Sequence, residues 1–406
     1  MHSLRPDQSP ELDQAMDARG PVAIWAFAPI FLYFVVGGVA TVMLGPLLPI
    51  LIPHWNIQDA QAGTLFTASF AGQFLGAWFA ARNLRASLLC GAALSAAGCF
   101  AMTWAAFDVA HVALFCVGLG LGAGLTAGNI VLGTARSANR ARLLLLLNVS
   151  WSIGAISCPL LVRAFVSAGI GFFFLTLSCA LAVAACLLLA IPRHGFAAAR
   201  SISSPEQRGS QRAPLPFVPL VVFAGVLLLY VGVENALGGW LPSYAVRVHS
   251  SMQSSAVAFS FWIAELAGRL IGTVLLIRVS ERALYRLCLS ALVFAGVVLC
   301  AGTNLSAGSI VALTLLCGMA IGPVYPLIVS FMLARTGHHP WLGTLFASAS
   351  LGGASLPWLT GVVSTHFESL RAGLIVPAAG AFLMLVLSPF IAKLPSKTAR
   401  EGALLQ

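Results

Sequence analysis

The stretch PLVVFAGVLLLYVGVENALGGWLPSYAV, from Pro219 to Val246, decides the fold class, because it is apolar and long enough to cross a lipid bilayer. Its one charged side chain is Glu234. Holding a charge at membrane depth costs about 2.5 to 3.5 kcal/mol on insertion scales, so such residues usually face a bundle interior or a water-filled pathway. A structural pairing with an arginine of a neighbouring helix would also satisfy the carboxylate, and position alone leaves both roles open.

The composition of the whole chain agrees with a membrane protein. Of the 406 residues, 59% are hydrophobic and 8% are charged, and the mean hydropathy is +0.94. Soluble domains carry about 25% charged residues. The chain is therefore expected to be an integral membrane protein with no room for a soluble catalytic domain.

Apolar stretches of about 20 residues recur along the chain and predict twelve transmembrane spans. All should be helices, because an open strand edge cannot be satisfied in lipid. The predicted fold is an all-α membrane protein with spans near 22–53, 58–81, 86–107, 109–135, 143–166, 169–191, 217–246, 255–277, 284–303, 306–333, 342–365 and 370–394.

The loop charges predict the orientation, because Lys and Arg concentrate on the cytoplasmic side of membrane proteins. With both termini inside, 18 of the 22 basic residues fall on that side. The net charge of +10 is then explained by attraction to an anionic inner leaflet, and no nucleic-acid partner is implied. We expect a multi-pass protein of a plasma membrane or a bacterial inner membrane, with the lipid bilayer as its surroundings.

A polar segment rich in Ser, Arg and Gly divides the chain into two halves of six spans. The predicted organisation is a cytoplasmic tail (1–21), a six-helix bundle (22–192), a cytoplasmic linker (193–216), a second six-helix bundle (217–394) and a second tail (395–406). The halves share dipeptides at an offset of 199 residues, which favours parallel repeats related about the membrane normal. The matched pairs are Ala135-Arg136 with Ala334-Arg335 and Gly154-Ala155 with Gly353-Ala354.

Glycine and proline concentrate in the first, fourth, seventh and tenth spans, and this predicts bends there. Ordinary close helix packing would explain most of the glycines individually. Pro323 and Pro326 are the clearest signal, because two prolines three residues apart leave backbone carbonyls without intrahelical donors.

This organisation resembles the major facilitator superfamily, and several motifs resemble its fucose, galactose and glucose symporter family, particularly the glucose-transporter-like branch. The resemblance implies a substrate site near midplane between two halves that rock against each other. It covers nearly all spans through short motifs, of which the seventh-span set is the most specific. The motifs are YVGVE (230–234), GGW (238–240) and Tyr244 in the seventh span, GPLLP (45–49), TAGN (126–129), NVS (148–150), IGA (153–155), FW (261–262), GRL (268–270) and GPVYP (322–326).

The resemblance also implies sugar binding and proton coupling through a first-span Asp, a fourth-span Glu and a fifth-span Asn. Only the asparagine, Asn148, is kept, since Gly45 and Leu125 occupy the two acid positions. The remaining intramembrane acids are Glu234, which has no evident partner on its own helix, and Glu265. Glu265 and Arg269 are spaced i, i+4 and are predicted to form a structural or gating pair. Glu234 and Glu265 are the candidate coupling groups.

The polar and aromatic residues near Glu234 suit a monosaccharide chemically. Sugar hydroxyls both donate and accept, so amides and carboxylates bind their edges, and flat rings cover the apolar face. Individually each Trp could instead belong to an interfacial aromatic belt, as Trp358 does by position. The candidate substrate-binding residues are Gln73, Asn129, Asn148, Trp151, Glu234, Asn235, Trp240, Trp262 and Tyr325.

The sequence thus predicts a monomeric secondary transporter that imports a neutral monosaccharide with protons, or with sodium, as the coupling ion. A facilitative uniporter, an exporter of other small organic solutes and a non-transporting receptor with the same fold are the alternatives. An enzyme is not expected, because no Ser-His pair or HExxH motif appears in the spans. No spacing of Cys or His predicts a metal site, and no organic cofactor is implied.

Overall fold

A computed structural model describes residues 27–133, 140–191, 217–336 and 342–393 of the chain. Within these ranges the regular structure is helical throughout. The predicted tails (1–21 and 395–406), the linker (193–216) and the dipeptide Ala135-Arg136 lie outside the described residues.

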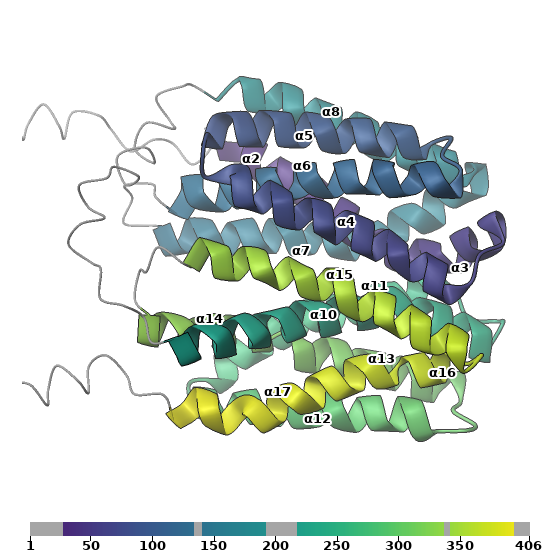
Figure 1. Ribbon diagram of the computed structural model, residues 1–406, viewed down its shortest axis with the longest axis vertical. Helices are drawn as coiled ribbons and strands as arrows, with labels where there is room; N and C mark the ends of the chain where they lie inside the picture. The colour runs from purple at the N-terminus through teal and green to yellow at the C-terminus, as the bar shows by residue number, and fades with distance from the viewer. Residues whose placement is uncertain (1–26, 134–139, 192–216, 337–341, 394–406) are drawn as a thin grey trace, which may run out of the picture.

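In the part of the chain that the structure describes, the helices form twelve segments that cross the bundle (Figure 1). Three pairs, α2 with α3, α13 with α14 and α16 with α17, each share one crossing. This arrangement confirms the predicted all-helical fold. In chain order the helices are α2 (Ala28–Val42), α3 (Leu44–Trp55), α4 (Asp59–Ala80), α5 (Leu84–Met102), α6 (Phe107–Gly133), α7 (Arg140–Phe165), the 3₁₀ turn η2 (Val166–Ala168), α8 (Ile170–Leu189), α10 (Phe217–Val248), α11 (Ser254–Leu275), α12 (Glu281–Ala301), α13 (Ala307–Ile321), α14 (Val324–Thr336), α15 (Leu342–His366), α16 (Leu370–Gly373) and α17 (Ile375–Lys393).

Among the described residues, nine helical segments are long and apolar enough to span a membrane, and ten are if the bent pair α2 and α3 counts as one. The two crossing helices that fall short of this hydropathy are α4 and α15. They pack against each other between the two halves of the molecule, so each has less surface facing lipid. Small and polar residues therefore replace the long aliphatic side chains of the outer helices.

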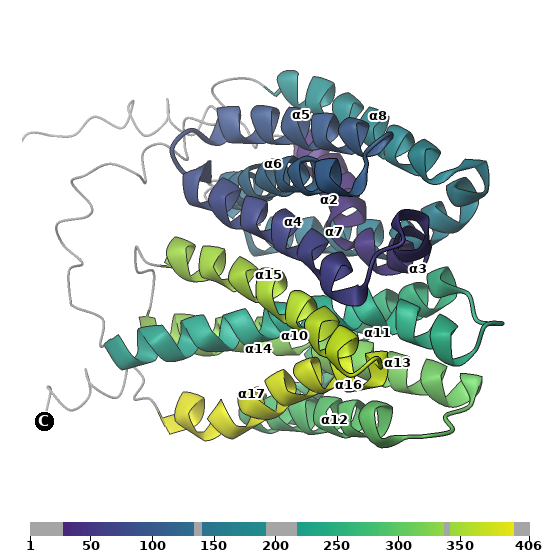
Figure 2. The ribbon, with the colours of Figure 1, turned by 45° about the vertical axis from the view of Figure 1, so that its right-hand side comes forward.

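The two halves are visible in both ribbon views, with α2 to α8 in one bundle and α10 to α17 in the other (Figures 1 and 2). They meet along α4 with α15, α7 with α11, and α3 with α10. We name the two faces of the bundle by their helix ends. The linker side is where α8 ends and α10 begins, and the distal side is the opposite face.

Backbone contacts show that the halves repeat the same packing. A Cβ atom at Gly122 of α6 would collide with the carbonyl oxygen of Gln73 in α4, and one at Gly322, after α13, would collide with that of Glu265 in α11. Close approach of this kind needs glycine at the contact. Gln73 and Glu265 therefore occupy equivalent places in the two halves.

The same comparison aligns α7 with α15. A Cβ atom at Gly154 would collide with the carbonyl oxygen of Val35 in α2, and one at Gly352 would collide with that of Leu228 in α10. The equivalent of Gly154 is therefore Gly352, and the predicted match with Gly353 is wrong by one residue. Sequence comparison could not separate two adjacent glycines, whereas only one of them faces the neighbouring backbone.

Two of the four predicted irregular spans are broken and two are continuous. The first span bends by 41° between α2 and α3, and the tenth breaks at Pro323 between α13 and α14. The fourth and seventh spans, α6 and α10, are each a single helix without a break, over 27 and 32 residues. Glycines of α6 such as Gly122 serve close packing against α4 instead.

Candidate functional site

Three charged side chains lie together near the middle of the bundle, and we call them the charged trio: Glu234 of α10 with Glu265 and Arg269 of α11. The Arg269 guanidinium forms an ion pair with Glu265 one turn away on the same helix. The same Nη2 atom is 3.7 Å from Oε1 of Glu234. Two carboxylates therefore share one guanidinium.

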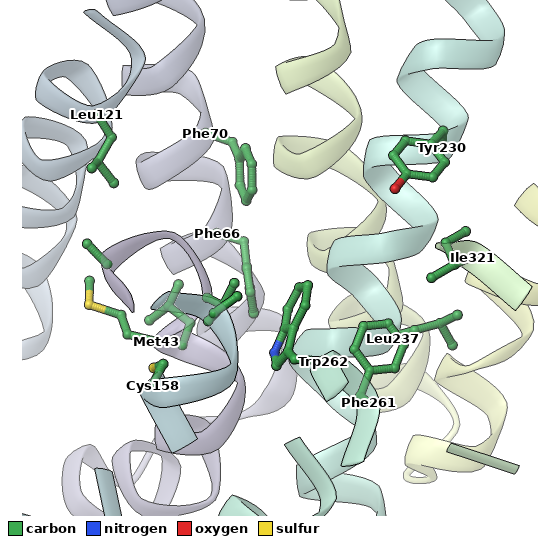
Figure 3. Close-up of a cluster of buried hydrophobic side chains, with 14 of the residues drawn as sticks. Met43, Phe66, Phe70, Leu121, Cys158, Tyr230, Leu237, Phe261, Trp262 and Ile321 are labelled. Carbon is green, nitrogen blue, oxygen red and sulfur yellow. The ribbon is translucent and has the colours of Figure 1, made fainter. Parts of the chain in front are cut away.

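The charged trio lies at the interface between the halves. Arg269 Nη1 donates a hydrogen bond of 3.1 Å to the Ser152 hydroxyl of α7, and its guanidinium carbon is 6.0 Å from the centroid of the Trp151 ring. Trp151 in turn meets Trp262 of α11 edge to face at 6.0 Å. Figure 3 shows Trp262 between the α4 side chains Phe66 and Phe70 and the second-half side chains Leu237 and Phe261.

Glu234 has a partner on its own helix, which corrects the sequence prediction. The Tyr230 hydroxyl donates a hydrogen bond to the Glu234 carboxylate from one turn earlier, and the Tyr230 ring packs against that of Tyr325 at a centroid distance of 5.4 Å. A search for charged partners overlooks this contact. The i, i+4 spacing of a tyrosine and a carboxylate is the signal that could have revealed it.

Two buried donors of α11 at the charged trio have no hydrogen-bond partner among the described residues: the Nε atom of Arg269 and the indole Nε1 of Trp262. The amide Nε2 of Gln73, at the equivalent place of the first half, is buried without a partner in the same way. The carboxyl groups are equally enclosed, since Glu234 and Glu265 are 8% and 2% exposed. Buried polar groups are normally paired, so a ligand with hydroxyl oxygens would satisfy these donors.

The three candidate asparagines each bond a carbonyl oxygen of their own helix. Asn148 Nδ2 donates to Leu144, Asn129 Nδ2 to Leu125, and Asn235 Nδ2 to Val231. Asn148 lies one turn from Ser152 on the same face of α7 and is exposed. It is therefore placed beside the charged trio, toward the linker side. Asn129 is also exposed, near the linker end of α6, whereas Asn235 is buried.

The structure places Trp240 apart from the charged trio. Its side chain is fully buried, and its indole Nε1 donates to the carbonyl oxygen of Pro357 in α15 at 2.9 Å. Its ring packs against Phe66 at 6.4 Å. No ring face is left for a sugar, so Trp240 joins α10 to α15. Trp358 is 41% exposed, as a belt residue would be.

A second polar group, on the distal side, escaped sequence analysis, and we call it the distal cluster: Asp59, Arg247, Ser364 and Thr365. Arg247 of α10 donates to both carboxylate oxygens of Asp59 of α4, at 2.7 and 2.5 Å. Ser364 of α15 donates to the same carboxylate at 2.5 Å, and the Ala60 amide donates to Thr365 Oγ1 at 2.8 Å. The distal cluster thus ties the first half to the second.

The two groups differ in their charge balance. Asp59 and Arg247 are matched one to one in a bidentate structural pair. The charged trio carries one negative charge in excess when all its members are ionised. Uptake of a single proton would remove this excess, whereas the distal cluster has no excess charge to neutralise.

Comparisons with known proteins agree on the fold. The family model of the Major Facilitator Superfamily matches residues 30–340. Bypass of stop codon protein 6 of Saccharomyces cerevisiae is 24% identical over 380 residues, covering 82% of this chain and 75% of that protein.

Two solved structures share the fold at low identity. An inward-facing, occupied bacterial homologue of the human lysosomal transporter Spinster has a TM-score of 0.73 at 14% identity, over 93% of this chain and 98% of that one. A D-xylose-proton symporter has a TM-score of 0.71 at 12% identity, over 92% and 98%. The fold is therefore one of membrane transporters, and the chain belongs to the Major Facilitator Superfamily.

Proposed function

We propose that the chain is a secondary active transporter that imports a neutral monosaccharide together with protons by alternating access. The observation that carries this proposal is the charged trio, in which two buried carboxylates share one guanidinium at the interface between the halves. Glu234 and Glu265 are the coupling groups, with a proton as the coupling ion.

The charged trio offers a route from protonation to movement. An unbalanced charge at membrane depth is costly, so the closed interface favours the neutral trio with one proton bound. Arg269 also bonds Ser152 of the other half. A change of charge on Glu234 or Glu265 redistributes the hydrogen bonds of Arg269 and thereby alters a contact between the halves.

The neutral residues around the trio support a sugar as the substrate. Trp151 and Trp262 contribute rings at the interface, and Asn148 and Gln73 contribute amides. The unpartnered donors of Gln73 and Trp262 would bind hydroxyl oxygens. One protein of the same fold is a D-xylose-proton symporter, which adds support by analogy only, since a fold does not specify a substrate.

Uptake and counterflow in proteoliposomes would test the proposal. A panel of hexoses, pentoses and amphipathic drugs should be compared under imposed pH or sodium gradients. We expect one or more monosaccharides to accumulate when the outside is acidic. Exchange without accumulation would indicate a uniporter. Accumulation that depends on a sodium gradient would indicate sodium as the coupling ion, and efflux of drugs would indicate an exporter. Absence of any transport would favour a receptor.

We further propose that the linker side faces the cytoplasm of a plasma membrane or a bacterial inner membrane. The described arginines near helix ends on that side include Arg82, Arg85 and Arg282, as the positive-inside rule requires. A cysteine introduced at Ser204, in the predicted linker, should react with an impermeant maleimide only from the cytoplasm. One at Ser251, in the exposed distal turn between α10 and α11, should react only from outside. Labelling of both from one side would contradict this orientation.

A further inference from the structure

A small basic recess lies at the linker side of the second half, away from the charged trio. It is lined by Arg282, Tyr285 and Arg286 of α12, Phe331 of α14, and Ser388 and Ile391 of α17. Three helices thus contribute to one site near their ends. Nothing in the proposed transport cycle uses these residues.

The two arginines of the recess lack acidic partners. Neither Arg282 nor Arg286 forms a salt bridge within the described parts of the chain. Arg286 Nε donates to the Ser388 hydroxyl at 3.3 Å. The acid of the same turn, Glu281, instead accepts hydrogen bonds from Ser330 of α14. Among the residues that the structure describes, neither guanidinium of the recess is paired with a carboxylate.

A buried hydroxyl that lines the recess is also unpartnered. Tyr285 is 1% exposed, and its hydroxyl makes no hydrogen bond with any described residue. The ring is held edge to face against Phe331 at 5.7 Å. A buried hydroxyl without a partner is rare in folded proteins, and here it adds a donor beside the two guanidinium groups.

We propose that this recess binds the phosphate of an anionic phospholipid headgroup. Guanidinium groups match phosphate oxygens in geometry and charge, and the Tyr285 and Ser388 hydroxyls supply further donors. The first turn of α12 adds the positive end of a helix dipole. Basic pockets between transmembrane helices near one membrane surface are suited to lipid headgroups.

The apolar surface next to the recess favours a lipid over a soluble phosphate. Leu287, which follows Arg286, is 60% exposed, and Val386 and Phe390 on α17 are 47% and 59% exposed. These exposed apolar side chains, close in sequence to residues of the basic recess, are available to contact acyl chains. A ligand with a phosphate joined to hydrocarbon matches both parts, whereas free phosphate matches only one. The site is separate from the substrate site, so it does not depend on which solute is transported.

Native mass spectrometry of the delipidated full-length protein would test the site. Dioleoylphosphatidylglycerol, dioleoylphosphatidylcholine and inorganic phosphate are the three probes. We expect the wild type to retain phosphatidylglycerol preferentially. Arg282→Gln with Arg286→Gln should weaken its retention by about tenfold or more, and Tyr285→Phe by about threefold. Arg82→Gln is the matched control for Arg282→Gln alone, because each removes one positive charge on the linker side of its own half.

Equal weakening in Arg82→Gln and Arg282→Gln would overturn the proposal by showing only general attraction to the surface. Unchanged retention in the double variant would also overturn it. If inorganic phosphate raises the melting temperature by as much as the lipid does, that result would support a phosphate site but would contradict a lipid as the bound molecule. If the double variant does not yield folded protein, Arg282→Gln alone and Tyr285→Phe decide the question, because each preserves most of the packing.

Discussion

The two halves of the molecule share their backbone packing but differ in chemistry at the centre. Gln73 and Glu265 are equivalent by their glycine contacts and lie 192 residues apart (265 minus 73). Val35 and Leu228 are equivalent in the same way at 193 residues (228 minus 35). The same offsets, 192 residues for α4 and α11 and 193 residues for α2 and α10, identify the first-half equivalents of the charged trio. The first half has Thr41, Gln73 and Ala77 where the second half has Glu234, Glu265 and Arg269.

This difference shows that the repeat determines the scaffold, whereas single positions determine the chemistry. Among the described residues, ion pairing at the centre is confined to the second half, and the first half contributes the neutral groups Ser152 and Trp151. The proposed proton coupling would therefore reside in the second half and act on neutral groups of the first half across the interface.

The largest effect should come from breaking the shared packing. Gly154→Ala and Gly352→Ala each force a Cβ atom into a backbone carbonyl, where overpacking costs about 1 to 3 kcal/mol or more. We expect both variants to lose most of the monodisperse protein in size-exclusion chromatography. Gly225→Ala is the control, because open space surrounds that position on α10. If Gly352→Ala is tolerated and Gly353→Ala is damaging, Gly353 would be the equivalent of Gly154, at the offset of 199 residues between the halves.

The next effect tests the chemical asymmetry. Glu234→Gln keeps the size and the hydrogen bond from Tyr230 but cannot exchange a proton, so accumulation driven by a pH gradient should be abolished. Energy-independent exchange should remain largely intact. Thr41→Val alters the equivalent position of the first half and should leave accumulation unchanged. Proteoliposome uptake measures both activities. Persistent accumulation in Glu234→Gln would transfer the coupling role to Glu265 or favour a uniporter.

A smaller effect is expected from the neutral contribution of the first half. Asn148→Leu removes an amide beside the charged trio and should weaken sugar binding by about 1 to 3 kcal/mol, because substrate hydroxyls are left unpaired. Equilibrium binding of the transported sugar measures this change. Ser150→Ala is the control, because Ser150 is two residues from both Asn148 and Ser152 and therefore lies on another face of α7. Unchanged affinity in Asn148→Leu, with a normal melting temperature, would remove Asn148 from the site.

The smallest effect should come from the distal cluster, because its arginine is 42% exposed and its ion pair is partly screened. Asp59→Asn should favour separation of the halves on the distal side by about 0.2 to 1 kcal/mol. A cysteine at Thr67, whose hydroxyl bonds Ala354 across the interface, should then be labelled up to about fivefold faster in a background without native cysteines. Exchanging the two charges, with Arg at 59 and Asp at 247, should slow labelling again. Equal rates throughout would deny the distal cluster a role in closure.

The sequence by itself determined the features that depend on neighbouring residues. Length and hydropathy over about 20 residues predict a helix that crosses the membrane, because lipid requires each segment to satisfy its own backbone. The i, i+4 spacing likewise predicts that Glu265 meets Arg269, since one helix turn brings the two side chains together. Pro323 and Pro326, three residues apart, indicated the break in the tenth span, because proline lacks a backbone donor. The single prolines Pro159 and Pro242, by contrast, lie inside unbroken helices.

Only the tertiary structure decided which helices meet and how each is rotated about its axis. Arg269 reaches Glu234 from 35 residues away and Ser152 from 117, and Arg247 reaches Asp59 from 188. Helix rotation likewise turns Trp240 toward α15, where it serves packing, and turns Gly352 toward the backbone of α10. In a helix that is apolar on nearly every face, periodicity does not show which face is buried, so helix packing selects the partners.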